Sequence, residues 1–180
     1  MPLNLPNVLT LSRIAFVPLL LLLLLGKQPG PIPGAAAVFC VAALTDAADG
    51  HIARSREMVT TFGRIADPLA DKLLVGTALA SLVMIDRLAL WIALVIGLRE
   101  ASVALLRWHA GRQGLVLHVS SLGKAKTCLQ MTTIVALMLV PDPGAPWVRA
   151  LLMAVVGLTV VSGLQYLVAF ARAPVMVPAR

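Results

Sequence analysis

Long apolar segments dominate this sequence of 180 residues and restrict it to few folds. Hydrophobic residues make up 59% of the chain, charged residues only 13%, and the mean hydropathy is +0.93. About 20 apolar residues in helical form cross the hydrocarbon core of a bilayer. Segments of that length lie near residues 7–26, 33–53, 68–86, 89–109, 121–140 and 147–170. The sequence therefore predicts an all-α integral membrane protein with six transmembrane helices, in which residues 1–180 form a single domain.

The distribution of basic residues predicts the orientation of the chain and the chemistry of its partners. Lys and Arg number 15 against 8 Asp and Glu. With both termini in the cytoplasm, only Lys27, Arg87 and Arg149 face outward, which agrees with the excess of positive charge on cytoplasmic flanks. Basic runs with interleaved aromatic residues are absent from the sequence. We therefore expect membrane lipids and phosphate groups as partners, and no nucleic acid.

Four of the chain's eight acidic residues are aspartates in one short window, Asp46, Asp49, Asp67 and Asp71. A charged carboxylate in a membrane costs roughly 2.5–3.5 kcal/mol, so such residues usually mark an ion or substrate site. Four carboxylates close together also repel one another unless some stay protonated or cations lie between them. An all-oxygen ligand set without a His or Cys cluster favours Mg²⁺ or Mn²⁺. We therefore predict a site for two such ions.

The spacing of the aspartates predicts that they occupy two helix ends. Asp46 and Asp49 lie three residues apart and share a face at the end of the second helix. Asp67 followed by Pro68 predicts the start of the third helix, with Asp67 as its cap and Asp71 one turn later. Arginines between the two pairs can approach phosphate oxygens. Carboxylates, metal ions and arginines together favour phosphoryl transfer, with one carboxylate accepting the proton of the attacking hydroxyl.

The complete pattern is more specific than this chemistry. It is Asp46-x2-Asp49-Gly50-x2-Ala53-Arg54-x8-Gly63-x3-Asp67-x3-Asp71, and it resembles the signature of the CDP-alcohol phosphatidyltransferase family at every defined position. The resemblance implies a homodimeric membrane enzyme with six helices that displaces CMP from a CDP-linked substrate. It also implies that Asp46, Asp49 and Asp67 bind one ion. Asp46, Asp67 and Asp71 would bind the second, and Asp71 would be the general base.

Residues around the aspartates are candidates for binding the CDP-lipid. Arg54 lies inside the motif and is expected to contact the phosphates of the nucleotide. Thr10 and Arg13 fall on one side of the first helix, where they either line the nucleotide pocket or act as capping and snorkelling residues. Thr60 either bonds a phosphate or shapes its loop. The complete set of candidates is Thr10, Arg13, Gly50, Ala53, Arg54, Thr60 and Gly63.

A second group of basic residues is a candidate site for the phosphate of the acceptor. Arg99 and Arg107 lie eight residues apart, a little over two turns of the fourth helix, while Lys124 and Lys126 open the fifth. All four can converge near the cytoplasmic surface. The alternative for each is an ordinary flanking charge on that side. Glu100 is a candidate salt-bridge partner for one of them.

Three outer stretches resemble the bacterial branch of the family whose donor is CDP-diacylglycerol and whose acceptor is sn-glycerol 3-phosphate. They are residues 4–13, 122–127 and 164–167. This resemblance implies a protein of the bacterial inner membrane with its active site facing the cytoplasm. Two alternatives within the family stay open, a cardiolipin synthase and a phosphatidylinositol-phosphate synthase. A more distant one is a non-enzymatic cation transporter, although arginines around the aspartates would repel its cargo.

Overall fold

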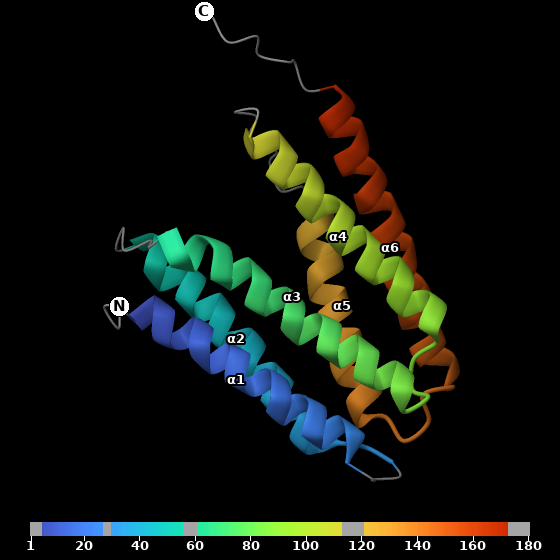
Figure 1. The fold of residues 1–180 in the computed structure, drawn as a ribbon. Helices are drawn as coiled ribbons and strands as arrows, with labels where there is room; N and C mark the ends of the chain where they lie inside the picture. The colour runs from blue at the N-terminus through green and yellow to red at the C-terminus, as the bar shows by residue number, and fades with distance from the viewer. Residues whose placement is uncertain (1–4, 27–29, 56–60, 113–120, 173–180) are drawn as a thin grey trace, which may run out of the picture. The chain divides into compact units, whose positions relative to one another are not determined.

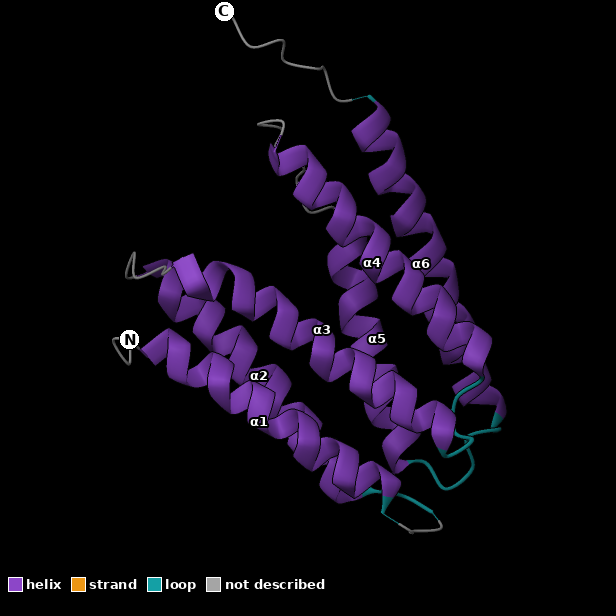
Figure 2. Ribbon diagram, in the orientation of Figure 1, coloured by secondary structure: helices purple, strands orange, loops and turns teal. Residues whose placement is uncertain are grey.

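The computed structural model describes residues 5–26, 30–55, 61–112 and 121–172. These residues form six helices and no strands, as Figures 1 and 2 show. In chain order the helices are α1 (Leu5–Leu25), α2 (Pro33–Ser55), α3 (Thr61–Met84), α4 (Leu90–Arg112), α5 (Ser121–Leu139) and α6 (Pro146–Ala171). The predicted all-α class is confirmed for the described residues, and each predicted apolar segment corresponds to one helix.

The start of α3 differs from the prediction. Asp67 and Pro68 do not begin this helix, because it starts at Thr61 and continues through both residues. A proline inside a helix removes one backbone donor, but its ring also holds φ near the helical value. One missing hydrogen bond does not end a helix that runs on for many residues. The prediction that Asp67 caps the third helix is therefore wrong.

Among the described helices, α6 is the one that passes a test of length and apolarity for crossing a membrane, with a mean hydropathy of 2.0. Shorter apolar stretches lie at Ala15–Leu25, Pro33–Thr45 and Lys72–Met84. The helix α4 does not meet the same criterion, because one spanning length of it contains three charged residues, Arg99, Glu100 and Arg107. Six membrane spans thus stay a prediction.

The structure divides into two compact units. The first comprises Met1–Leu88 with Ile134–Pro143, and the second comprises Ala89–Thr133 with Gly144–Arg180. In the first unit α1 packs against α2 and α3, and α2 contacts α3. Its core contains large side chains that are fully buried, among them Leu20, Leu24, Phe39, Leu74 and Leu82. The prediction of a single domain concerns the whole chain and stays a prediction.

In the second unit α6 packs against α4 through one regular seam. The buried residues of α6 recur at alternating intervals of four and three, the spacing that keeps one face of a helix against its neighbour. They are Val148, Leu152, Val155, Thr159, Ser162 and Tyr166. The seam is aliphatic in its first half and polar in its second half. The second half carries three hydroxyl groups, and those of Ser162 and Tyr166 accept hydrogen bonds from arginines of α4.

In the first unit, Arg87 fastens the turn after α3 to two other segments. Its Nη1 donates hydrogen bonds of 2.8 Å to the carbonyl oxygens of Leu137 and Val140, and its Nη2 donates to that of Gly30. The Ile32 amide also donates to the carbonyl of Met138, at 2.7 Å. The entry to α2 and the end of α5 are thereby held together.

We expect Arg87→Lys to lower the free energy of unfolding by about 2 kcal/mol, because an ammonium cannot reproduce the planar fork that contacts three carbonyls. Thermal unfolding of the purified protein in detergent measures this loss. Arg149→Lys is the matched control, since Arg149 is exposed in the first turn of α6. Equal melting temperatures for the two variants would contradict the role of Arg87.

Candidate functional site

The residues of the aspartate motif lie on two neighbouring helices of the first unit. Asp46, Asp49, Gly50, Ala53 and Arg54 lie in the C-terminal part of α2, while Gly63, Asp67 and Asp71 lie in the N-terminal part of α3. Thr10 and Arg13 lie on α1, which packs against both helices (Figure 1). Thr60 falls outside the described residues. The fold therefore brings the two helices of the motif and α1 into one bundle.

The helical backbone supports the predicted register of the aspartates. The segments around Asp46 and Asp49 and around Asp67 and Asp71 are continuous helix, so intervals of three and four residues place each pair on one side of its helix. Among the side chains that the structure describes, no three His, Cys, Asp or Glu residues form a group able to hold a metal ion. The side chains of the motif aspartates are not among those described. The two-ion site stays a prediction, and its all-oxygen donor set fits a hard divalent cation.

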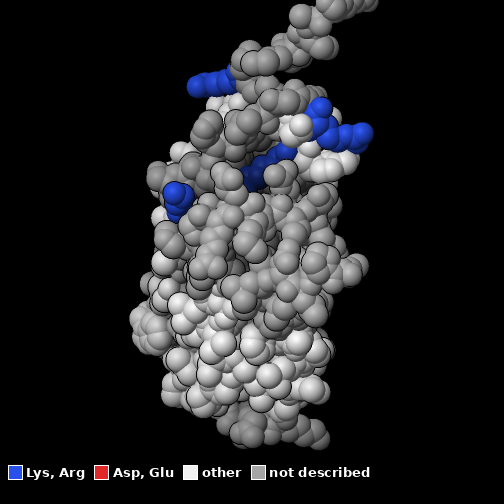
Figure 3. Space-filling view, turned by 90° about the vertical axis from the view of Figure 1, so that its left-hand side faces the viewer, with Lys and Arg blue, Asp and Glu red and all other residues white. Residues whose placement is uncertain are grey.

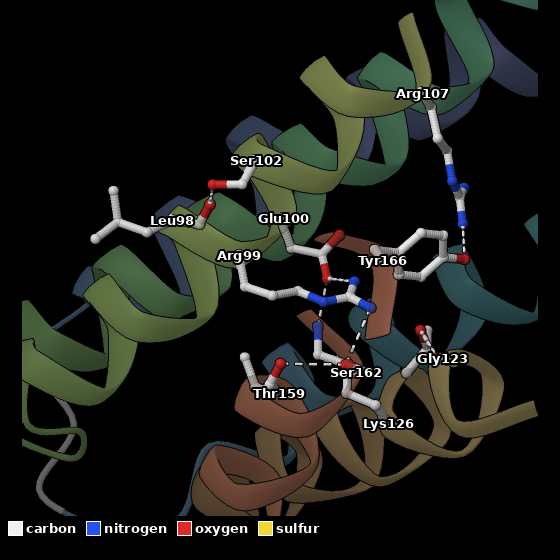
Figure 4. A network of polar contacts seen from close by, with 11 residues as sticks. Leu98, Arg99, Glu100, Ser102, Arg107, Gly123, Lys126, Thr159, Ser162 and Tyr166 are labelled. Atoms are coloured by element: carbon white, nitrogen blue, oxygen red, sulfur yellow. Dashed lines mark hydrogen bonds and ion pairs between the residues drawn. The ribbon is translucent and has the colours of Figure 1, made fainter. Parts of the chain in front are cut away.

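The predicted acceptor residues lie in the second unit, where one carboxylate holds two of them. Lys126 Nζ donates to Oε1 of Glu100, and Arg99 Nη1 lies 3.1 Å from the same oxygen (Figure 4). The Lys126 side chain is 1% exposed and that of Glu100 is 32% exposed. The prediction that Glu100 pairs with one of the basic residues is confirmed, and it pairs with two.

Burial explains why this ion pair is needed. An isolated ammonium group removed from water costs several kcal/mol, and a carboxylate in contact offsets that cost. Lys126 reaches Glu100 from α5, so the pair also joins α5 to α4 within the second unit. The ammonium group of Lys126 is therefore buried with Glu100 as its ion-pair partner.

Arg99 is held from two sides. Besides its contact with Glu100, its Nη2 donates a hydrogen bond of 3.1 Å to Oγ of Ser162, and the Ser162 hydroxyl donates at 3.2 Å to the carbonyl of Thr159. Its aliphatic stem runs past Gly163, where an added Cβ would lie 3.3 Å from Arg99 Cγ. The absence of a side chain at Gly163 therefore gives Arg99 its path along α6.

Tyr166 contacts two of the arginines of α4. Arg107 Nη2 donates a hydrogen bond to the Tyr166 hydroxyl, and its guanidinium carbon lies 5.0 Å from the ring centroid. The guanidinium carbon of Arg99 lies 5.6 Å from the same centroid. Both distances are within the range of cation–π attraction. Tyr166 is not among the site residues predicted from sequence, although it lies in one of the three outer stretches that resemble the family.

The four predicted acceptor residues therefore have different surroundings. Arg99, Arg107 and Lys126 belong to one network with Glu100 and Tyr166 (Figure 4). Lys124 is exposed on α5 and is not part of that network. The network holds three cations and one carboxylate, so it retains net positive charge. On the face drawn in Figure 3 the described charged side chains are basic, with no described acidic ones visible. The net positive charge of the network can attract a phosphate group.

Comparison with known proteins identifies the class to which this chain belongs. Residues 3–163 match the sequence profile of the CDP-alcohol phosphatidyltransferases. The chain belongs to this family, whose members are membrane-bound and use divalent metal ions. It is therefore a transferase of phospholipid biosynthesis.

Individual members of the family are similar to this chain over about nine tenths of its length. The chain is 38% identical to the CDP-diacylglycerol–glycerol-3-phosphate 3-phosphatidyltransferase of Bacillus subtilis, over 91% of this chain and 93% of that protein. It is also 38% identical to the protein of the same name from Pseudomonas fluorescens, over 91% of this chain and 88% of the relative. A CMP-forming cardiolipin synthase from rice is 36% identical over 89% of this chain and 53% of its own length.

Proposed function

We propose that this protein transfers the phosphatidyl group of CDP-diacylglycerol to a hydroxyl of sn-glycerol 3-phosphate, which gives phosphatidylglycerophosphate and CMP. The observation that carries the proposal is the complete aspartate motif, which lies on two packed helices of a chain that belongs to the family. The names of the bacterial relatives, which match over nine tenths of this chain, support this donor and this acceptor.

The proposed reaction forms one phosphorus–oxygen bond and breaks another. The acceptor hydroxyl oxygen attacks the phosphorus that carries diacylglycerol, and the bond from that phosphorus to CMP breaks. Asp71 accepts the proton of the attacking hydroxyl, and Arg54 contacts the phosphates of the nucleotide. Two Mg²⁺ or Mn²⁺ ions, held by Asp46, Asp49, Asp67 and Asp71, would neutralise charge on the phosphates. Thr10, Arg13, Gly50, Ala53, Thr60 and Gly63 complete the proposed CDP-lipid site.

The basic network of the second unit supports a phosphorylated acceptor. A phosphate monoester carries nearly two negative charges at neutral pH, and arginines bind such groups through paired hydrogen bonds. We assign binding of the acceptor phosphate to Arg99, Arg107 and Lys126 of this network, and to Lys124 outside it. A cardiolipin synthase would accept phosphatidylglycerol, whose phosphodiester carries a single charge, and so has less use for several cations. Inositol phosphate would suit the same charges.

We further propose the cellular setting of the reaction. The chain would cross the bacterial inner membrane six times with both termini in the cytoplasm, and its active site would open to that side. The family resemblance supports a homodimer. The exposed leucines and valines of α6 suit contact with lipid acyl chains, among them Val160, Val161, Leu164, Leu167 and Val168.

The direct test is CMP release by the purified protein in detergent with CDP-diacylglycerol and Mg²⁺. Glycerol 3-phosphate, inositol phosphate, phosphatidylglycerol and serine are compared as acceptors. We expect release with glycerol 3-phosphate alone. Release with another acceptor would keep the aspartate roles and reassign the basic network. A protein that releases no CMP, and instead carries metal ions across liposomes, would be a transporter.

A further inference from the structure

Two arginines of the proposed acceptor site share a single buried aromatic ring. Arg99 and Arg107 carry like charges on one face of α4 and would repel each other if they were free. Their guanidinium carbons lie 5.6 and 5.0 Å, respectively, from the centroid of the Tyr166 ring. Tyr166 is 3% exposed and comes from α6, so the ring is fixed by packing rather than by the arginines alone (Figure 4).

The hydroxyl of Tyr166 adds a hydrogen bond to one of the two arginines. It accepts a hydrogen bond from Arg107, which leaves the other donors of that guanidinium for a ligand. One turn earlier on α6, Ser162 accepts a hydrogen bond from Arg99. Packing at this position needs only the aromatic ring, and a phenylalanine would fill the same space. The tyrosine hydroxyl is therefore explained by Arg107 and not by packing.

We propose that Tyr166 is a positioning residue for the acceptor phosphate. It holds Arg107 through its hydroxyl and both guanidinium groups through its ring, so that the two arginines present donors to one phosphate group. Because the arginines are ordered before the acceptor arrives, binding does not have to order them, and the affinity for the acceptor rises. This inference rests on the proposed function and adds a residue to its acceptor site.

The test measures steady-state CMP release by Tyr166→Phe and Tyr166→Leu while glycerol 3-phosphate and CDP-diacylglycerol are varied separately. Tyr166→Phe keeps the ring and loses the hydroxyl, and we expect the KM for glycerol 3-phosphate to rise about tenfold. Tyr166→Leu also loses the ring, and we expect a rise of about thirtyfold. The KM for CDP-diacylglycerol should change less than about twofold in both variants. Met153→Ala, a truncation at an exposed position of α6, should leave both constants unchanged.

A purely structural role for Tyr166 gives a different pattern. It would lower the amount of active enzyme and so the maximal rate, without a selective change in one KM. An unchanged KM for glycerol 3-phosphate in Tyr166→Phe, or equal increases for both substrates, overturns this inference while the wild-type reaction stands. Should Tyr166→Leu fail to fold, Tyr166→Phe alone decides, because it preserves the packing. A wild-type protein that releases no CMP with any phosphorylated acceptor overturns the proposed function and this inference together.

Discussion

Asp71→Asn is expected to slow CMP release by about 10²–10⁴-fold, the usual contribution of a general base. Asparagine has nearly the same size as aspartate and keeps one oxygen ligand, but its amide cannot accept the proton of the attacking hydroxyl. Binding of CDP-diacylglycerol should survive, because Asp46, Asp49 and Asp67 retain their charge. Single-turnover CMP release measures the rate. The shift of the melting temperature by added CDP-diacylglycerol measures binding.

The matched control for this change is Asp86→Asn. Asp86 is exposed in the turn between α3 and α4 and adopts a positive φ of 58°, a conformation that asparagine tolerates well. This control makes the same chemical change outside the motif and should leave turnover intact. If Asp71→Asn turned over at the wild-type rate, Asp71 would lose its assignment as the base. A loss of turnover together with a loss of lipid binding would instead indicate that Asp71 mainly holds a metal ion.

Glu100→Ala is expected to lower the free energy of unfolding by about 3 kcal/mol, the lower end of the range for breaking a buried ion pair. The variant leaves the Lys126 ammonium buried without its carboxylate and releases Arg99 from the same oxygen. The loss is at the lower end because the Glu100 side chain is 32% exposed, and solvent weakens its attraction to the two cations. Thermal unfolding in detergent should show a lower melting temperature and a smaller yield of folded protein.

A double variant separates loss of charge balance from loss of packing. Glu100→Ala combined with Lys126→Met removes both members of the pair and keeps an unbranched apolar side chain at position 126. It should recover most of the lost stability, since no uncompensated charge stays buried. A double variant as unstable as Glu100→Ala alone would show that the ion pair is not the cause. Activity of the double variant with glycerol 3-phosphate additionally tests whether Lys126 contributes to acceptor binding.

The sequence predicted the helices well and one helix boundary poorly. A chain that spans a membrane must satisfy its backbone hydrogen bonds within each segment, so a long apolar run indicates a helix directly. All six predicted segments correspond to helices in the described residues. The start of α3 was misplaced because Asp67 and Pro68 are typical of helix starts but do not prevent a helix from passing through them. Such short signals express a preference, which the surrounding helix overrode.

The register of each aspartate pair could be predicted from sequence because its residues are close along the chain, and helical periodicity relates neighbours at intervals of three and four. The basic network of the second unit could be predicted only in part. Lys126 pairs with Glu100 across 26 positions, and Arg107 pairs with Tyr166 across 59. No local pattern specifies partners at such separations.

The sequence by itself therefore determined that this protein is helical and apolar, and that it carries the motif of its family. The tertiary structure alone decided which lysine at the start of α5 is buried in an ion pair and which is exposed to solvent. Lys126 and Lys124 lie two residues apart on α5, yet one is buried against Glu100 and the other is exposed. The physical reason is that burial and ion pairing depend on the residues that neighbouring helices bring close. Composition places positive charge in this region, and only packing sets how each charge is held.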